Sequence, residues 1–359
     1  MDRIAIKIGS NVLTRRDGSI DFTRISALVD QVCDLRRQGI EVIMISSGAV
    51  AFGRDSLNVS APLDTVSARQ LFSAVGQTKL MHTYYQLFKE RGLECGQVLT
   101  TKEGLSTRHH YLNQKHCMEV MLSAGVIPIV NENDTISLTE LMFTDNDELS
   151  GMVATMMEAR MLIILSDVDG IFTGDPSEPG SELIREIAPG SDEAEQFILG
   201  TKSSRGRGGM RTKYAIARKL ALEGIPVAIA CGKRDGILNA VAAGSSDLPY
   251  TLFRAAEKPI SGVKMWIAHS GGFAKGSVTV NAGAAEALLG DGATSLLPVG
   301  ITAVEGDFEK DDIVKILDPD GRCIAVGKAN CDADTVRSQM GRRNAREFIH
   351  YDYLYIEQI

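Results

Sequence analysis

Residues 130–151 read Val-Asn-Glu-Asn-Asp-Thr-Ile-Ser-Leu-Thr-Glu-Leu-Met-Phe-Thr-Asp-Asn-Asp-Glu-Leu-Ser-Gly, a polar loop between two apolar segments. The run Gly125-Val-Ile-Pro-Ile-Val130 before it predicts a buried strand. Apolar residues at helical spacing after it predict a helix that begins near Asp147. In α/β sheets, ligands bind at loops that leave the carboxyl ends of strands, so we expect this loop to hold a small amino-acid substrate beside a nucleotide phosphate. Asp and Asn also cap helices and stabilise turns, so the alternative that this loop has only a structural role remains.

Strands and helices alternate on both sides of this loop. Apolar β-branched runs predict strands, and stretches with helical periodicity lie between them. The alternation predicts an α/β domain over residues 1–250, a three-layer αβα sandwich with a mostly parallel central sheet. Small residues and two prolines predict a linker at 251–262. Short strands between glycine turns, among them 278–280, 295–297, 313–316 and 323–326, predict a small β-barrel at 263–359.

Bulk composition limits the classes of function. A chain of 359 residues exceeds what one hydrophobic core usually supports, which agrees with two domains. The net charge of -8 argues against electrostatic binding of nucleic acid by the whole chain. Six scattered cysteines without a Cys-x-x-Cys pair favour reduced thiols in the cytoplasm over a disulfide framework or a zinc site. No signal peptide is recognisable and no apolar run is long enough to span a membrane.

Two lysines are candidates for handling a phosphoryl group. Lys7 lies in the apolar run 3–9, where a charge needs a partner. Lys213 follows the glycine loop Gly206-Arg-Gly-Gly-Met-Arg-Thr, whose backbone N–H groups could face phosphate oxygens. Together they could flank a transferring phosphoryl group and offset its charge. The alternatives are an edge-strand lysine that points to water and a loop that is simply flexible.

Other catalytic patterns have little support. Neither the Gly-x-x-x-x-Gly-Lys-Ser/Thr phosphate loop nor a dinucleotide fingerprint follows the first strand, and no Gly-x-Ser-x-Gly elbow is present. His109, His110 and the pair His116-Cys117 have no matching ligands nearby in sequence, so no metal site is predicted there.

Several ordered motifs carry a resemblance over almost the whole chain. They are Lys7-Ile-Gly-Ser, Ser46-Ser-Gly-Ala, Asn131-Glu-Asn-Asp134, Thr144-Asp-Asn-Asp147, Ser166-Asp-Val-Asp-Gly170 and Gly208-Gly-Met-x-Thr-Lys213. This set resembles the amino-acid kinase family, and within it the kinases that phosphorylate glutamate. The C-terminal segments Ser295–Ile301 and Leu317–Gly321 are similar to the PUA-type domain that some of these kinases carry.

The resemblance implies a reaction and a set of site residues. ATP, bound with Mg²⁺, would phosphorylate the side-chain carboxylate of L-glutamate, the first step of proline biosynthesis. Lys7 and Lys213 would stabilise the phosphoryl group, and Asp147 would hold both lysines. The residues implied to bind glutamate are Ser47, Asp134 and Asn146. Those implied to bind the nucleotide are Lys7, Ser166, Asp167, Arg207, Gly208, Gly209, Met210, Arg211, Thr212 and Lys213.

The resemblance also implies feedback inhibition by proline and a homo-oligomer, a dimer or tetramer. Three positions depart from the family pattern: Thr144, Arg207 and Arg211, of which the two arginines could touch phosphate or point to solvent. None of these departures removes a proposed catalytic group.

The C-terminal module resembles RNA-binding domains of modifying enzymes. Residues 252–359 contain 12 Lys and Arg against 15 Asp and Glu, a net charge of -3, so phosphate-driven RNA affinity is not expected. A regulatory or structural role is the interpretation we favour. Two alternatives stay open for the whole chain: another amino-acid kinase, acting on aspartate, acetylglutamate or carbamate, and an RNA-binding ligand sensor.

Overall fold

The computed structural model describes residues 2–59, 62–102, 105, 108–136, 146–198, 209–257, 267, 274–290, 294–342 and 346–356. The chain divides into two compact units, the first of Met1–Leu105 and Tyr111–Pro259 and the second of Ser106–His110 and Ile260–Ile359. Each unit is described by itself below.

The first unit is built on an eight-stranded sheet with the order β3-β4-β2-β1-β5-β9-β10-β8. Its strands are β1 (Arg3–Ile8), β2 (Glu41–Ser46), β3 (Cys95–Thr100), β4 (Ile127–Glu132), β5 (Met161–Ser166), β8 (Glu186–Ile187), β9 (Val227–Cys231) and β10 (Tyr250–Phe253). All neighbouring pairs are parallel except β9 and β10. A short hairpin of β6 (Ile171–Phe172) and β7 (Leu183–Ile184) lies outside this sheet.

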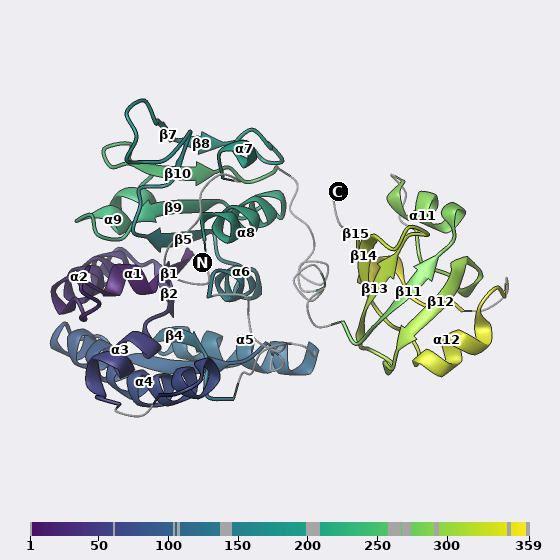
Figure 1. Ribbon diagram of the computed structural model, residues 1–359, viewed down its shortest axis with the longest axis horizontal. Helices are drawn as coiled ribbons and strands as arrows, with labels where there is room; N and C mark the ends of the chain where they lie inside the picture. The colour runs from purple at the N-terminus through teal and green to yellow at the C-terminus, as the bar shows by residue number, and fades with distance from the viewer. Residues whose placement is uncertain are drawn as a thin grey trace. The chain divides into compact units, whose positions relative to one another are not determined.

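Helices cover both faces of this sheet. They are α1 (Ser10–Leu13), α2 (Phe22–Arg37), α3 (Ala49–Ser56), α4 (Thr65–Glu90), α5 (Arg108–Ser123), α6 (Asn146–Met156), α7 (Glu195–Ile198), α8 (Met210–Leu222) and α9 (Ile237–Ala242). Figure 1 shows α2 and α9 on one face and α6 and α8 on the other. The predicted α/β architecture with a mostly parallel sheet is therefore confirmed. Among the described residues, no helix combines the length and apolar character needed to cross a membrane.

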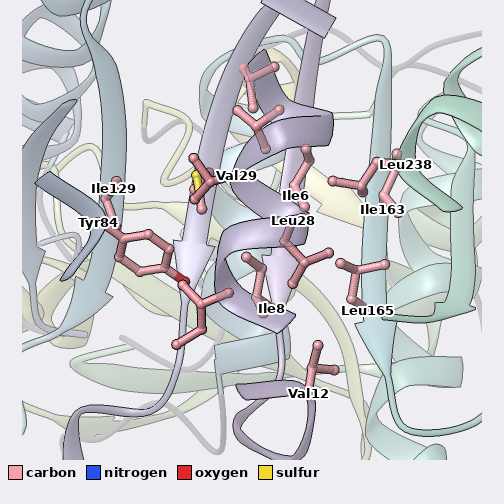
Figure 2. Close-up of a cluster of buried hydrophobic side chains, with 14 of the residues drawn as sticks. Ile6, Ile8, Val12, Leu28, Val29, Tyr84, Ile129, Ile163, Leu165 and Leu238 are labelled. Atoms are coloured by element: carbon pink, nitrogen blue, oxygen red, sulfur yellow. The ribbon is translucent and has the colours of Figure 1, made fainter. Parts of the chain in front are cut away.

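The core under α2 and α9 follows from the alternation of side chains along the central strands. Ile4, Ile6 and Ile8 of β1 are fully buried in one cluster with residues of α2, α4 and α9. Figure 2 shows Ile6 and Ile8 beside Leu28, with Ile163 and Leu165 of β5 next to them. Because successive side chains of a strand point to opposite faces, Ala5 and Lys7 lie on the other face, which α6 covers.

Three local predictions differ from the structure. Residues 251–253, predicted as linker, pair antiparallel with β9. The short run after Pro249 carries too little pattern to predict a strand by itself, and it becomes one because the edge of β9 is available for pairing. Residue type predicts Thr23 as the N-cap of the helix that follows it, but the cap of α2 is Asp21, whose carboxylate accepts from the Arg24 backbone N–H. Residues 295–297 form no strand; Leu296 makes only an isolated bridge to Ile349.

The second unit contains a five-stranded sheet with the order β12-β11-β13-β14-β15. Its elements are β11 (Gly276–Val280), α11 (Ala282–Leu289), β12 (Ile301–Gly306), β13 (Ile313–Leu317), β14 (Cys323–Lys328), α12 (Ala333–Gln339) and β15 (Leu354–Ile356). Its own core includes Val278, Ile316 and Phe348, all fully buried. The predicted strand-rich module is confirmed, whereas its closure into a barrel stays a prediction.

Candidate active site

A buried group of three charges forms where β1, α6 and α8 meet. Lys7 lies in β1, in register with Ile45 of β2 on one side and Ile164 of β5 on the other. Asp147 is in the first turn of α6, and Lys213 is in the first turn of α8. We call Lys7, Asp147 and Lys213 the ion-pair cluster.

Both lysines bind the same carboxylate. Lys7 Nζ lies 2.5 Å from Asp147 Oδ1, and Lys213 Nζ lies 2.9 Å from Asp147 Oδ2. Asp147 is fully buried, and the two lysines are only 5% and 7% exposed. Burial acts to raise the pKa of Asp147, but attraction by the two ammonium groups outweighs it, so the pKa lies below its usual value. The cluster therefore keeps one positive charge in excess, which suits an arriving phosphoryl group.

Two of the predicted substrate residues meet beside this cluster. Asn146 precedes Asp147 in α6, and Ser47 follows the end of β2. Asn146 Nδ2 donates to Ser47 Oγ at 2.9 Å and to Asn131 Oδ1 at 3.1 Å. The carboxyl ends of β2 and β4 and the start of α6 are thereby linked directly.

The third predicted substrate residue, Asp134, belongs to a charged group after β4. The Arg69 guanidinium of α4 hydrogen-bonds to the Asp134 carboxylate, and its Nη2 also lies 3.3 Å from Glu132 Oε2. Glu132 is buried and Asp134 is 12% exposed at its side chain. Two carboxylates share one guanidinium, so this group keeps a net negative charge, which suits a substrate ammonium group.

We call the predicted substrate residues Ser47, Asp134 and Asn146, together with their immediate neighbours, the substrate side. Helix α4 contacts it through three polar residues spaced by seven: Gln70, Gln77 and Tyr84. A spacing of seven returns to nearly the same face of a helix. Gln70 Nε2 donates to the Thr135 carbonyl at 2.8 Å. Gln77 Oε1 accepts from Asn131 Nδ2 at 2.8 Å, and the Tyr84 hydroxyl lies 2.9 Å from Ser46 Oγ.

Two glycines let α4 lie directly against α3, the helix that follows Ser47. A Cβ atom at Gly76 would overlap the Ala49 carbonyl, and one at Gly53 would overlap the Phe72 backbone. The backbones of the two helices therefore touch, so α4 is held in a fixed position relative to the substrate residues.

The predicted nucleotide residues lie at the ends of β5 and α8. Asp167 accepts from Asn11 Nδ2 at 3.0 Å, and Ser166 Oγ donates to Asp167 Oδ1 at 3.2 Å. Helix α8 is capped by Gly209, which has no side chain to bind the first backbone N–H groups. Those groups, in Met210, Arg211 and Thr212, suit an anion. Arg211 is exposed; Thr144, Arg207 and Gly208 lie outside the described residues.

Sequence reasoning missed three residues of the site. It proposed no role for Asn131, although this residue lies in the quoted loop. Arg69 and Gln77 were missed because they come from a helix more than fifty residues earlier in the chain. Polar residues at spacing seven in α4 were a usable signal for Gln77, whereas nothing local singles out Arg69.

Comparison with known proteins decides the family. The sequence profile described as the amino acid kinase family matches residues 2–231, which is more than half of the chain. The chain belongs to the amino acid kinase family. Membership of a kinase family implies that the chain uses ATP. The PUA domain profile matches residues 276–351, within the second unit.

Relatives within the family match the chain from end to end. A glutamate 5-kinase from Bacteroides thetaiotaomicron is 59% identical over 99% of this chain and 98% of its own. The glutamate 5-kinase of Chlorobaculum tepidum is 46% identical over 99% of this chain and 97% of its own. Among solved structures, UMP kinase from Bacillus anthracis has a TM-score of 0.50 and 16% identity over 70% of this chain and 96% of that one, a likeness that concerns the fold alone.

Proposed function

We propose that this protein transfers the γ-phosphoryl group of ATP to the side-chain carboxylate of L-glutamate, giving glutamyl 5-phosphate and ADP, the first step of proline biosynthesis. The observation that carries the proposal is the convergence of Lys7 and Lys213 on Asp147, directly beside Asn146 and Ser47. The choice of glutamate is supported by relatives named glutamate 5-kinase that match over nearly their whole length.

The chemistry needs charge neutralisation rather than a general base. A carboxylate is already ionised at neutral pH, so one of its oxygens attacks the γ-phosphorus without losing a proton. The new carboxyl O–P bond forms as the bond to the bridging oxygen of ADP breaks. Lys7 and Lys213 offset the negative charge on the transferring group, and Asp147 keeps their ammonium groups in place.

We assign glutamate recognition to the residues on the substrate side. Asp134 accepts from the α-ammonium group, and Ser47 and Asn146 bind the remaining polar atoms. The partly buried Arg69 contact fixes the Asp134 carboxylate before the substrate arrives, which lowers the entropy lost on binding.

We assign the nucleotide to the other side of the ion-pair cluster. Ser166 and Asp167 line its site, and the N-terminal turn of α8 (Gly209–Lys213) faces the phosphates, with Arg207 and Gly208 of the preceding loop. No group of three or more His, Cys, Asp or Glu side chains that could hold a metal occurs in the described part of the chain. We assign Mg²⁺, which favours oxygen ligands, to the ATP phosphates rather than to an all-protein cage.

Four further assignments complete the proposal, of which the first two rest on the family resemblance. Proline inhibits at or near the glutamate site, and the protein forms a homo-oligomer. The six cysteines are all free thiols, which supports a reducing, cytoplasmic setting. The PUA-type domain has a regulatory or structural role, since its net negative charge gives RNA little electrostatic attraction.

A trapping assay tests the proposal. Incubation with glutamate, MgATP and hydroxylamine converts the acyl phosphate to a hydroxamate, and we expect product only when all three are present. Aspartate, N-acetylglutamate and carbamate in place of glutamate test the other kinases of the family. Turnover of one of these without glutamate turnover would reassign the substrate; salt-dependent RNA retention without any turnover would favour the sensor alternative. Adding proline to the same assay tests inhibition.

A further inference from the structure

We propose that Gln77 of α4 is a positioning residue for glutamate, because its side-chain oxygen accepts the hydrogen bond that anchors a chain of hydrogen bonds ending at the proposed substrate residues. We call Gln77, Asn131, Asn146 and Ser47 the amide chain. Gln77 itself is held away from the reacting atoms by Asn131, which lies between it and the substrate residues. The inference rests on the proposed function, since it concerns how that site recognises glutamate.

A backbone group fixes which way the amide chain runs. The Glu132 backbone N–H donates to Asn131 Oδ1 at 2.9 Å. A backbone N–H can only donate, so the Asn131 oxygen must be on that side and its Nδ2 on the other. Asn131 Nδ2 then needs an acceptor, and Gln77 Oε1 is that acceptor, 2.8 Å away.

The direction is passed on to the substrate residues. Asn131 Oδ1 also accepts from Asn146 Nδ2 at 3.1 Å, so the Asn146 nitrogen faces Asn131 and Ser47. Ser47 Oγ accepts from that nitrogen, which leaves the hydroxyl hydrogen for another acceptor. Asn146 Oδ1 is left as an acceptor. A hydroxyl donor fits a carboxylate oxygen, and an amide oxygen fits an ammonium group, which are the two charged groups of an amino acid.

The remaining polar atom of Gln77 indicates that its amide is not there for stability alone. Gln77 Nε2 is buried and has no hydrogen-bond partner among the described residues. An unsatisfied buried donor costs free energy, so an apolar side chain of equal length would remove that cost while losing the accepting oxygen. Removing the unsatisfied donor should raise the stability and losing the acceptor should lower it, so the net change in stability is small. Only the loss of the acceptor affects the proposed substrate residues.

Two substitutions separate the accepting oxygen from the rest of the side chain. Gln77→Met keeps the length and removes the acceptor; Gln77→Glu keeps an accepting oxygen at the same place. In the hydroxamate assay, Gln77→Met is expected to raise the KM for glutamate about tenfold, with the KM for ATP within about twofold of wild type. Gln77→Glu is expected to keep the glutamate KM within about threefold of wild type. Thermal unfolding confirms that each variant folds, and Gln77→Ala replaces Gln77→Met should the latter fail to fold.

Each outcome decides the inference. A selective rise in glutamate KM for Gln77→Met with recovery in Gln77→Glu supports it. An unchanged glutamate KM in Gln77→Met, equal impairment in both variants, or parallel changes in the KM for ATP would overturn it. If the wild-type protein itself forms no hydroxamate from glutamate, the proposed function fails instead, and the two failures are thereby distinguished.

Discussion

The phosphoryl side and the substrate side of the candidate site are organised by different interactions. On the phosphoryl side, the ion-pair cluster joins three charged groups that are nearly excluded from water. On the substrate side, the amide chain joins neutral groups, and the charged Arg69 contacts lie nearer the surface. Charge–charge interactions are strong and poorly screened when buried, so the first side is rigid and sensitive to the loss of any member. Neutral hydrogen bonds contribute less each, but they carry direction, which is what discrimination between substrates requires.

The largest effect is expected on the phosphoryl side. Lys213→Ala removes one of the two ammonium groups that we propose to face the transferring phosphoryl group, so kcat should fall by about 10⁴-fold. Lys7 still pairs with Asp147, and the fold should persist. The hydroxamate assay measures kcat, and Lys219→Ala on the same helix is the matched control. Unchanged turnover in Lys213→Ala would remove Lys213 from the mechanism.

The next effect concerns stability. Asp147→Asn keeps the shape of the side chain but leaves two buried ammonium groups without their carboxylate, so the free energy of unfolding should fall by about 4 kcal/mol. Denaturant unfolding measures it. A loss of unfolding free energy below about 1 kcal/mol would mean that water already screens the ion-pair cluster. The phosphoryl side would then not be held by stronger interactions than the substrate side.

The same pair of proteins gives a pH test. The pKa of Asp147 is lowered in the folded state, so its contribution to stability is fully present above the unfolded value of 3.8 and is lost as pH falls through the lower folded value. The stability difference between wild type and Asp147→Asn should therefore stay constant from neutral pH down to 3.8 and shrink only below it. A difference that already declines between pH 7 and 5 would contradict the lowered pKa.

A smaller effect is expected from the charged contacts of the substrate side. Arg69→Met frees the Asp134 carboxylate from its guanidinium and brings it into repulsion with Glu132, so the KM for glutamate should rise about tenfold. Saturating glutamate should restore most of the turnover, because Arg69 contacts the proposed substrate residue Asp134 and its neighbour Glu132. Lys89→Met, at the exposed end of the same helix, controls for loss of a charge in α4. A fall in kcat without a change in the KM for glutamate would mean that Arg69 acts on phosphoryl transfer and not on glutamate binding.

The smallest effect is expected at the hydrogen bond between Tyr84 of α4 and Ser46, the residue before Ser47. Tyr84→Phe deletes a buried hydroxyl that pairs with Ser46 Oγ, which should cost about 1 kcal/mol of stability. The glutamate KM should change by less than about threefold, because Ser47 keeps its bond from Asn146. Unfolding and steady-state kinetics measure both. A larger kinetic effect than that of Gln77→Met would shift the positioning role from Gln77 to Tyr84.

Sequence reasoning predicted the ion-pair cluster better than the substrate side, for a physical reason. A lysine in an apolar strand needs a partner, so Lys7 was marked by its own neighbours in the chain. The members of the amide chain are neutral, and neutral polar residues are common in helices and loops without any special role. Gln77 reaches Asn131 only because α4 lies against the end of β4, and this arrangement depends on the topology of the sheet.

The errors in the fold have a similar origin. Residues 251–253 look unstructured alone because a four-residue strand carries little pattern, and it is the free edge of β9 that makes them part of the sheet. The helix start at Asp21 was missed because Thr23 is also a good cap by residue type, and the choice between them depends on which N–H group the side chain reaches.

The central position of β1 affects how the molecule must be made. Its two neighbours, β2 and β5, come from residues 41–46 and 161–166, and the last lysine of the cluster arrives in α8. A ribosome therefore exposes the first strand long before the segment that will shield its second edge has been synthesised. Pairing over such a separation is slow, so the emerging chain carries an open strand edge that chaperones are suited to cover. Catalytic competence begins only after most of the first unit has left the exit tunnel.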